Sequence, residues 1–352
     1  MDESNLLKLT GHMPEVEKYQ KTLESLSERW DLLSLLGQMS NVNMDMSDTR
    51  KEFEDLTKLL LAHLGKERLN KISLEMNSKS QVAVDIIIRN LFERTADIGF
   101  LATDEDVRNY FEDITSAEQS STQTTQQDSL EKYLRQRFEE YVLKYSVYYN
   151  IVLVDTNSNV VLQLDESNKL QKTTSTFIDE AITTSDEYIE YYGHTDLSST
   201  KEKNLVYAYK VTKNNNPDSE ILGVIALLFK FEDEMKGIFS NLLAKDDWMN
   251  ISLLDNNCQV IASSDSTVIP IGSTLEKSQI DSCKIVRFAG QEYLSKTCKT
   301  NGYQGFFGLD WLGHVMIPLA HAFDTCDEDI TQELDDETLE LVIQNSNLLV
   351  KN

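Results

Sequence analysis

Two stretches that lie 100 residues apart decide the fold: Asn150–Asp165, NIVLVDTNSNVVLQLD, and Asn250–Asp265, NISLLDNNCQVIASSD. They align without a gap. The identical pairs are Asn150/Asn250, Ile151/Ile251, Leu153/Leu253, Asp155/Asp255, Asn157/Asn257, Val160/Val260 and Asp165/Asp265. Each stretch reads as a β-hairpin, because an apolar strand, a polar turn opened by aspartate and a second apolar strand follow one another. Aspartate suits such a turn, since its side chain accepts hydrogen bonds from backbone N–H groups further along the chain.

The repeat continues beyond the hairpins. A strand LGVIALLF begins at Leu222 and a strand LGHVMIPL begins at Leu312, and an acidic amphipathic segment follows each. Further strands are expected over 204–212 and 284–297. A period near 100 residues is too long for a solenoid. We therefore predict an α+β protein with two tandem modules, each an antiparallel sheet with flanking helices.

The first third of the chain reads as helix. Apolar residues recur at spacings of three and four over 23–39 and again over 53–64, with a break expected at 45–49. A long helix is predicted over 69–102; it is apolar on more than one face, so partners should cover it on two sides. Asp104 is expected to cap a short helix after it. The polar stretch 116–129 is predicted to be an exposed loop, followed by a helix over 130–145.

Composition excludes several function classes. Lys and Arg number 33 against 59 Asp and Glu, so the net charge is −26, which disfavours binding to nucleic acid or to anionic lipid. The longest apolar run, Ile221–Phe229, is too short to span a bilayer, and the N-terminus does not read as a secretory signal. The five histidines are scattered, so we expect neither a metal nor another cofactor. The cysteines, in no C-x-x-C pair, are Cys258, Cys283, Cys298 and Cys326. We expect four reduced thiols in a cytoplasmic protein.

Beyond these patterns, the chain resembles a known family over roughly residues 70–325. The stretch RNLFERTADIGFLATDEDVRNYF, Arg89–Phe111, together with LLDNNCQVIASSD and the strand region 292–323, resembles the double Cache sensor domain of bacterial chemoreceptors and sensor kinases. Within that last region Gly305, Gly308, Trp311 and Pro318 stand where a membrane-proximal Cache module has its closing turn and last strand. The resemblance implies two tandem PAS-like modules behind a long helix. It also points to the group of Cache proteins whose longer members carry a CheW-type chemotaxis adaptor domain.

The chain departs from that family in three respects. It has no flanking transmembrane helices, it lacks the Arg-x-Trp-Tyr pattern of the amino-acid-binding version, and it shows no kinase, cyclase or methyl-accepting output sequence. The expected organisation is a helical region over 1–68, a long helix and helical lead-in over 69–145, a first Cache module over 146–236, a second over 246–323, and an acidic helix over 324–352 that leads toward an output domain.

An aromatic cluster in the first module is the candidate binding site. The predicted ligand-binding residues are Tyr188, Tyr192, Asp196, Tyr207 and Tyr209. Tyrosines combine apolar contact with a hydroxyl group, and the carboxylate would hold an amine or another hydrogen-bond donor. The resemblance places the family's pocket between this segment and the sheet. The alternative is that the tyrosines pack the sheet face. A second set, ranked lower, is Arg287, Tyr293 and Tyr303 in the second module.

Catalysis has little support, because no nucleophile elbow, phosphate-binding loop or dinucleotide fingerprint is present. The predicted function is ligand sensing in a chemotaxis or related signalling protein, as a homodimer through its N-terminal helices that acts on chemotaxis signalling proteins. The charged residues Arg89, Glu93, Arg94 and Asp97 are expected to pair along the long helix or to hold a partner. The alternative function is a protein–protein scaffold with vestigial Cache pockets.

Overall fold

A computed structural model describes residues 9–39, 47–120, 125–216, 218–245, 247–278 and 282–324. The chain divides into two compact units, one formed by Met1–Ile72 with Pro318–Asn352 and the other by Ser73–Ile317. The predicted C-terminal helix over 324–352 and Cys326 lie outside the described residues, apart from Asp324. None of the described helices is both long and apolar enough to cross a membrane.

The first unit contains α2 (Pro14–Met39) and the beginning of α3 (Ser47–Ala102). Two ion pairs join these helices: Arg50 to Asp31 at 2.8 Å and Arg68 to Glu15 at 3.3 Å. Gly65 is needed where the chain segments approach closely, because a Cβ there would lie 2.7 Å from the Thr10 side chain.

Helix α3 is one continuous helix of 56 residues, so the expected separation into a helix near 53–64 and another from 69 is wrong. The residues between those segments, GKERLN over 65–70, include no proline and are mostly good helix formers, which lets the helix continue. As expected, Asp104 caps the next helix, α4 (Glu105–Ser120), by accepting the Asp106 N–H at 2.9 Å.

The loop predicted over 116–129 is also largely wrong. Helix α4 continues to Ser120 and α5 (Thr125–Lys144) begins at Thr125. The stretch is polar but contains neither Gly nor Pro, and its glutamines and glutamate favour helix as much as loop. Polarity alone was therefore a poor indicator of a loop at this position.

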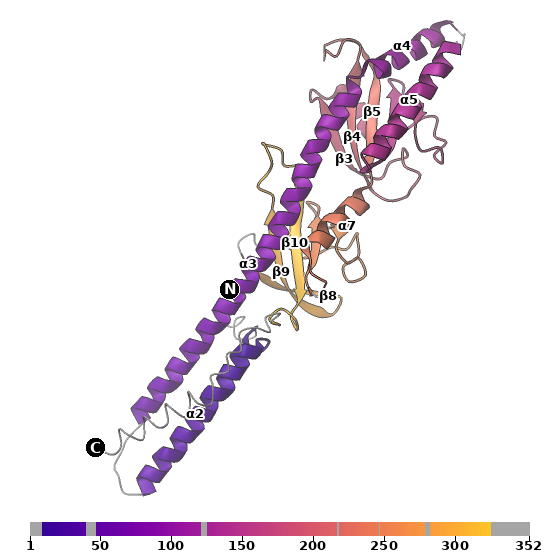
Figure 1. Ribbon diagram of the computed structural model, residues 1–352. Helices are drawn as coiled ribbons and strands as arrows, with labels where there is room; N and C mark the ends of the chain where they lie inside the picture. The colour runs from indigo at the N-terminus through magenta and orange to yellow at the C-terminus, as the bar shows by residue number, and fades with distance from the viewer. Residues whose placement is uncertain are drawn as a thin grey trace. The chain divides into compact units, whose positions relative to one another are not determined.

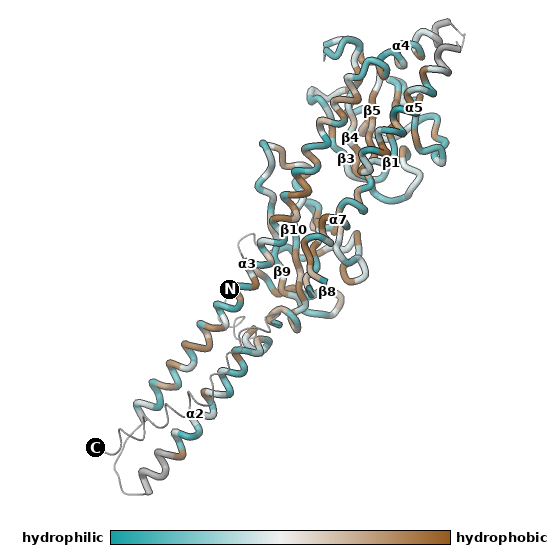
Figure 2. The backbone as a smooth tube through the Cα atoms, in the orientation of Figure 1, coloured by the Kyte–Doolittle hydropathy of each residue, from teal (hydrophilic) through white to brown (hydrophobic). Residues whose placement is uncertain are grey.

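The second unit contains two antiparallel five-stranded sheets (Figure 1). The first sheet consists of β1 (Tyr148–Asp155), β2 (Val160–Gln163), β3 (Tyr188–Gly193), β4 (Asn204–Thr212) and β5 (Ile221–Phe229). The second consists of β6 (Asn250–Leu254), β7 (Val260–Ser263), β8 (Lys284–Phe288), β9 (Gln291–Lys299) and β10 (Leu312–Pro318). Their strand orders, β2-β1-β5-β4-β3 and β7-β6-β10-β9-β8, are the same, which confirms the tandem α+β architecture. Figure 2 shows that the strands carry much of the hydrophobic sequence of this unit.

The two hairpin turns are equivalent, as the repeat predicts. Asp155 Oδ1 accepts the N–H groups of residues 157 and 159 at 2.8 and 2.7 Å, and Asp255 Oδ1 accepts those of 257 and 259 at 2.9 and 2.8 Å. In each turn the third residue after the aspartate has a left-handed backbone, with φ of 66° at Ser158 and 62° at Cys258. The same side-chain chemistry therefore builds the same turn twice.

The two faces of the first sheet are covered differently. One face packs against α3, while α6 (Thr176–Thr183) covers the other; α7 (Phe231–Leu242) follows the sheet. In the second sheet Gly313 on β10 faces α3, and a Cβ there would lie 2.7 Å from the Ser80 carbonyl oxygen. No helix lies between β7 and β8 in the described residues, so the second sheet has no counterpart of α6 there.

Candidate functional site

The predicted tyrosines lie on the face of the first sheet that packs against α3. Tyr188 is opposite Tyr209 and Glu190 is opposite Tyr207 in the β3–β4 ladder, so their side chains share one face. The Tyr207 hydroxyl donates to the carbonyl oxygen of Leu91 on α3 at 3.2 Å, and Tyr207 is fully buried. These tyrosines therefore attach the sheet to the long helix.

Asp196 lies elsewhere. It accepts the Thr173 hydroxyl at 2.6 Å, the Thr174 N–H at 2.7 Å and the Ser175 hydroxyl at 2.6 Å, just before α6. Burial works against its ionisation, but the hydrogen bonds from Ser175, Thr173 and Thr174 outweigh burial and lower the pKa of Asp196. The carboxylate anchors the chain at the start of α6. The structure therefore does not bring Asp196 together with Tyr188, Tyr207 and Tyr209, because they belong to different faces of the module, and ligand binding by several of the five residues stays a prediction.

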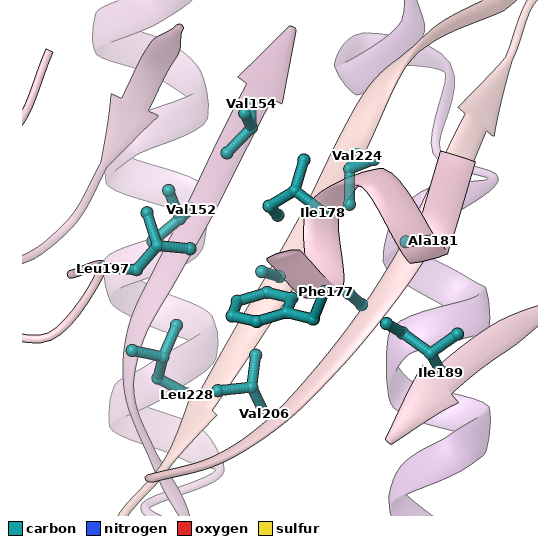
Figure 3. Packing of buried hydrophobic residues seen from close by; sticks show 12 residues of the cluster. Val152, Val154, Phe177, Ile178, Ala181, Ile189, Leu197, Val206, Val224 and Leu228 are labelled. Carbon is teal, nitrogen blue, oxygen red and sulfur yellow. The ribbon is translucent and has the colours of Figure 1, made fainter. Parts of the chain in front are cut away.

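The opposite face of the first sheet is filled by the protein's own side chains (Figure 3). Phe177 and Ile178 of α6, 1 % and 0 % exposed, lie on it and contact a buried cluster that includes Val152, Val206 and Leu228. Phe177 also stacks on Tyr191, with 4.9 Å between ring centroids. The face of the first sheet under α6 is thus filled by hydrophobic side chains of this chain.

Glu190 is a buried titratable residue on this face that the sequence did not single out. It lies between the α3-facing tyrosines, and its Oε1 is buried without a hydrogen-bond partner in the structure as described. Burial raises the pKa of Glu190 to about 7, against a smaller opposing effect of the Tyr207 hydroxyl. The alternation of Tyr188, Glu190 and Tyr192 along β3 was the available signal, because alternate strand residues share a face.

Tyr192 lies on the same face, at the end of β3, and reaches the second module. Its ring is 5.5 Å from that of Phe231 and 5.4 Å from that of Trp311. Beside it is a hollow of about 220 Å³, which Glu202, Glu232 and Gln259 also line. Of the five predicted site residues, only Tyr192 borders this hollow.

The lower-ranked set in the second module is not brought together either. Tyr293 is 4 % exposed in the core of that module, whereas Arg287 is exposed on β8 opposite Glu292. Tyr303 packs instead on Phe92 of α3, with ring centroids 5.3 Å apart.

In the second sheet, buried polar side chains stand at positions that are apolar in the first sheet. Ser252 stands at the position of Val152 in the repeat; it is opposite His314, while Val152 is opposite Ala226. His314 is fully buried, its Nδ1 is 2.9 Å from the Thr297 hydroxyl, and burial lowers its pKa to about 4. The two modules have therefore kept one topology with different interiors.

The charged residues of α3 pair as the sequence indicates. Arg89 and Glu93 lie 3.1 Å apart, and Arg94 and Asp97 lie 3.0 Å apart. The structure adds a contact with the sheet, since the Tyr148 hydroxyl donates to Asp97 at 2.6 Å. The described cysteines, Cys258, Cys283 and Cys298, are free thiols.

Comparison with known proteins shows the fold. No family model matches the sequence, and no curated protein matches it either. Among solved structures, the extracellular domain of the histidine kinase rpHK1S-Z16 has a TM-score of 0.51 at 10 % identity over 71 % of this chain and 95 % of its own. The V. cholerae DctB histidine kinase sensor domain has a TM-score of 0.47 at 14 % identity, and the match covers 72 % of this chain and 98 % of the DctB domain. The ligand-binding domain of Campylobacter jejuni chemoreceptor Tlp3, in complex with L-norvaline, has a TM-score of 0.48 at 12 % identity. The match covers 75 % of this chain and 97 % of the Tlp3 domain. The chain has a tandem Cache/PAS-like fold.

Proposed function

We propose that this chain is the input module of a sensory protein, in which binding of a small molecule alters the contacts between the Cache modules and α3. One observation carries the proposal: both Cache modules are hydrogen-bonded to the same helix. The first sheet uses the Tyr207–Leu91 and Tyr148–Asp97 bonds, and the second module adds the Thr300 hydroxyl, which donates to Asp85 at 2.9 Å.

These contacts provide a physical route for a signal. The sheet–helix interface is packed, so it responds to a change in a module by shifting between discrete arrangements rather than by deforming continuously. A ligand that binds one arrangement more tightly increases its population, and α3 then moves relative to the sheets by about an ångström or two. The sensor fold shared with the histidine kinase domain supports this function.

We also propose that the active form is a homodimer through the N-terminal helices and that its output is a chemotaxis or related signalling protein. Support for the dimer comes from apolar side chains that α3 leaves exposed within the first unit. Leu56 is 61 % exposed and Leu59 is 68 % exposed. A second copy of the chain would cover these leucines at the helical spacing seen in helix pairs.

A second candidate function is an interaction scaffold with a vestigial first pocket. The observation that favours it is the occupation of the outer face of the first sheet by Phe177 and Ile178. A scaffold would keep the module fold for stability without responding to small molecules.

The two functions can be separated by a thermal-shift screen of metabolites, followed by hydrogen–deuterium exchange of α3 with each hit. A sensor predicts that a hit changes exchange in the part of α3 within the second unit, and that Tyr207→Phe, which removes the bond to Leu91, weakens this response. Tyr133→Phe, at an exposed position on α5, is the matched control and should respond as the wild type. A scaffold predicts no change in α3 with any hit.

A further inference from the structure

The hollow beside Tyr192 is bordered by parts of both modules. The end of β3 and the segment before β4 contribute Tyr192, Glu202 and Lys203, while the region of the β6–β7 turn contributes Gln259. Its volume of about 220 Å³ is enough for a small organic molecule, since a water molecule takes about 30 Å³ in the liquid. A ligand there would contact both modules at once.

One wall of the hollow is aromatic and held in place. The rings of Tyr192 and Phe231 lie 5.5 Å apart, and both contact Trp311, with centroid distances of 5.4 and 5.3 Å. Trp311 is 2 % exposed and Phe231 is 6 % exposed, so the packing around them sets the orientation of the Tyr192 ring. Faces of aromatic rings attract cations, most strongly where water is partly excluded.

The charged groups of the hollow are mainly acidic. Glu202 and Glu232 both line it, and neither forms an ion pair among the residues that the structure describes. Burial raises the pKa of Glu232, and the nearby charges of Glu202 and Asp233 raise it further, which shows that these carboxylates repel one another. A positive charge placed between them would remove that repulsion.

The chain already places one cation at this wall. The Lys203 ammonium lies 5.8 Å from the Tyr192 ring centroid and donates to Gln259 Oε1 at 2.8 Å, so it joins the two modules. The hollow therefore has the groups that recognise an ammonium: an aromatic face, an amide oxygen and carboxylates.

We propose that this hollow is a binding site for a small organic cation with a quaternary or primary ammonium head, which lies against Tyr192 and Phe231 and is paired by Glu202 and Glu232. The proposal rests on the sensory function proposed above and names its ligand class and site. It differs from the predicted site, because it lies at the junction of the modules and uses only Tyr192 of the five residues predicted there. Occupancy would strengthen the link between the modules that Lys203 and Gln259 now form.

The test is isothermal titration calorimetry on the full chain with three probes: choline, its neutral carbon analogue 3,3-dimethylbutan-1-ol, and ethanolamine as a primary ammonium. We expect choline to bind at least about tenfold more tightly than the alcohol, because only the charged probe gains from the carboxylates and the ring face. Glu202→Gln and Glu232→Gln should each weaken choline binding by about five- to fiftyfold, and Tyr192→Leu by about tenfold.

Glu139→Gln, at an exposed position on α5, is the control for loss of one negative charge and should bind choline as the wild type does. Thermal unfolding of each variant checks that the fold is retained. The proposal is overturned if neither choline nor ethanolamine binds, if choline and the alcohol bind alike, or if both glutamine variants bind as the wild type. A metabolite that changes α3 exchange equally in the wild type and these variants would remove this site and leave the sensory function standing.

Discussion

Glu190→Gln tests the buried carboxyl group between the first sheet and α3. In the folded protein the pKa of Glu190 is about 7, compared with an ordinary value of 4.5, because burial disfavours the charged form. Between these pH values the folded state holds a proton that the unfolded chain has lost. The contribution of the Glu190 carboxyl group to the free energy of unfolding is therefore fully present below pH 4.5 and is lost as the pH rises through 7.

The magnitude follows from the two pKa values. At 1.36 kcal/mol per pKa unit, the difference corresponds to about 3.4 kcal/mol, and since solvent reaches part of this side chain we expect about 2 kcal/mol. Glutamine has the shape of the protonated acid but does not ionise. The free energy of unfolding of the wild type, measured relative to the Glu190→Gln variant, should therefore fall by about 2 kcal/mol between pH 4.5 and pH 8.

Urea unfolding at several pH values, followed by circular dichroism, measures this difference. The effects of other titratable groups cancel when the wild type is compared with the variant. One of these groups is His314, whose pKa of about 4 makes the folded state more stable as the pH rises from 4 to 6.5, opposite to the effect of Glu190. Glu180→Gln, at an exposed position on α6, is the control and should follow the wild type. The reasoning is refuted if the wild type and Glu190→Gln have the same pH dependence and if a carbon-13 titration of the Glu190 carboxyl has its midpoint below pH 5.

Three further predictions concern the repeat, the core and the dimer. Asp155→Ala and Asp255→Ala should each lower the free energy of unfolding by about 1–3 kcal/mol, because each removes a carboxylate that accepts two turn N–H groups. Chemical denaturation measures this loss, and a large loss in only one module would contradict the equivalence of the turns. Phe177→Ala should cost about 3–5 kcal/mol in the same assay, since the ring is 1 % exposed, and a cost below 1 kcal/mol would show that it does not fill the core. Leu56→Lys combined with Leu59→Lys should convert a dimer to a monomer in light scattering, and an unchanged mass would exclude this face as the interface.

The repeat, and with it the module fold, could be predicted from the sequence because its causes are local. An aspartate after an apolar strand organises the N–H groups that follow it within the same turn, and alternation of apolar residues marks the strands around it. The same local chemistry occurs at Asp155 and Asp255, so one turn predicts the other. Continuity of α3 and the extent of α4 were harder to predict, because polar helix formers are compatible with both helix and loop.

The binding site could not be predicted in this way, because it depends on which face of a strand meets which neighbour. Alternation along β3 and β4 shows that Tyr188, Glu190 and Tyr207 share a face, but only the tertiary structure shows that this face meets α3. Likewise, Phe177 reads as an ordinary helix residue until α6 is placed on the sheet, where its ring becomes part of the buried core. The sequence by itself therefore determined two copies of a hairpin-led sheet, because short-range hydrogen bonds and strand periodicity encode it. Packing between distant segments, which only the tertiary structure shows, decided the rest. It places Phe177 in the core, Tyr207 against the long helix and Tyr192 beside the hollow between the modules.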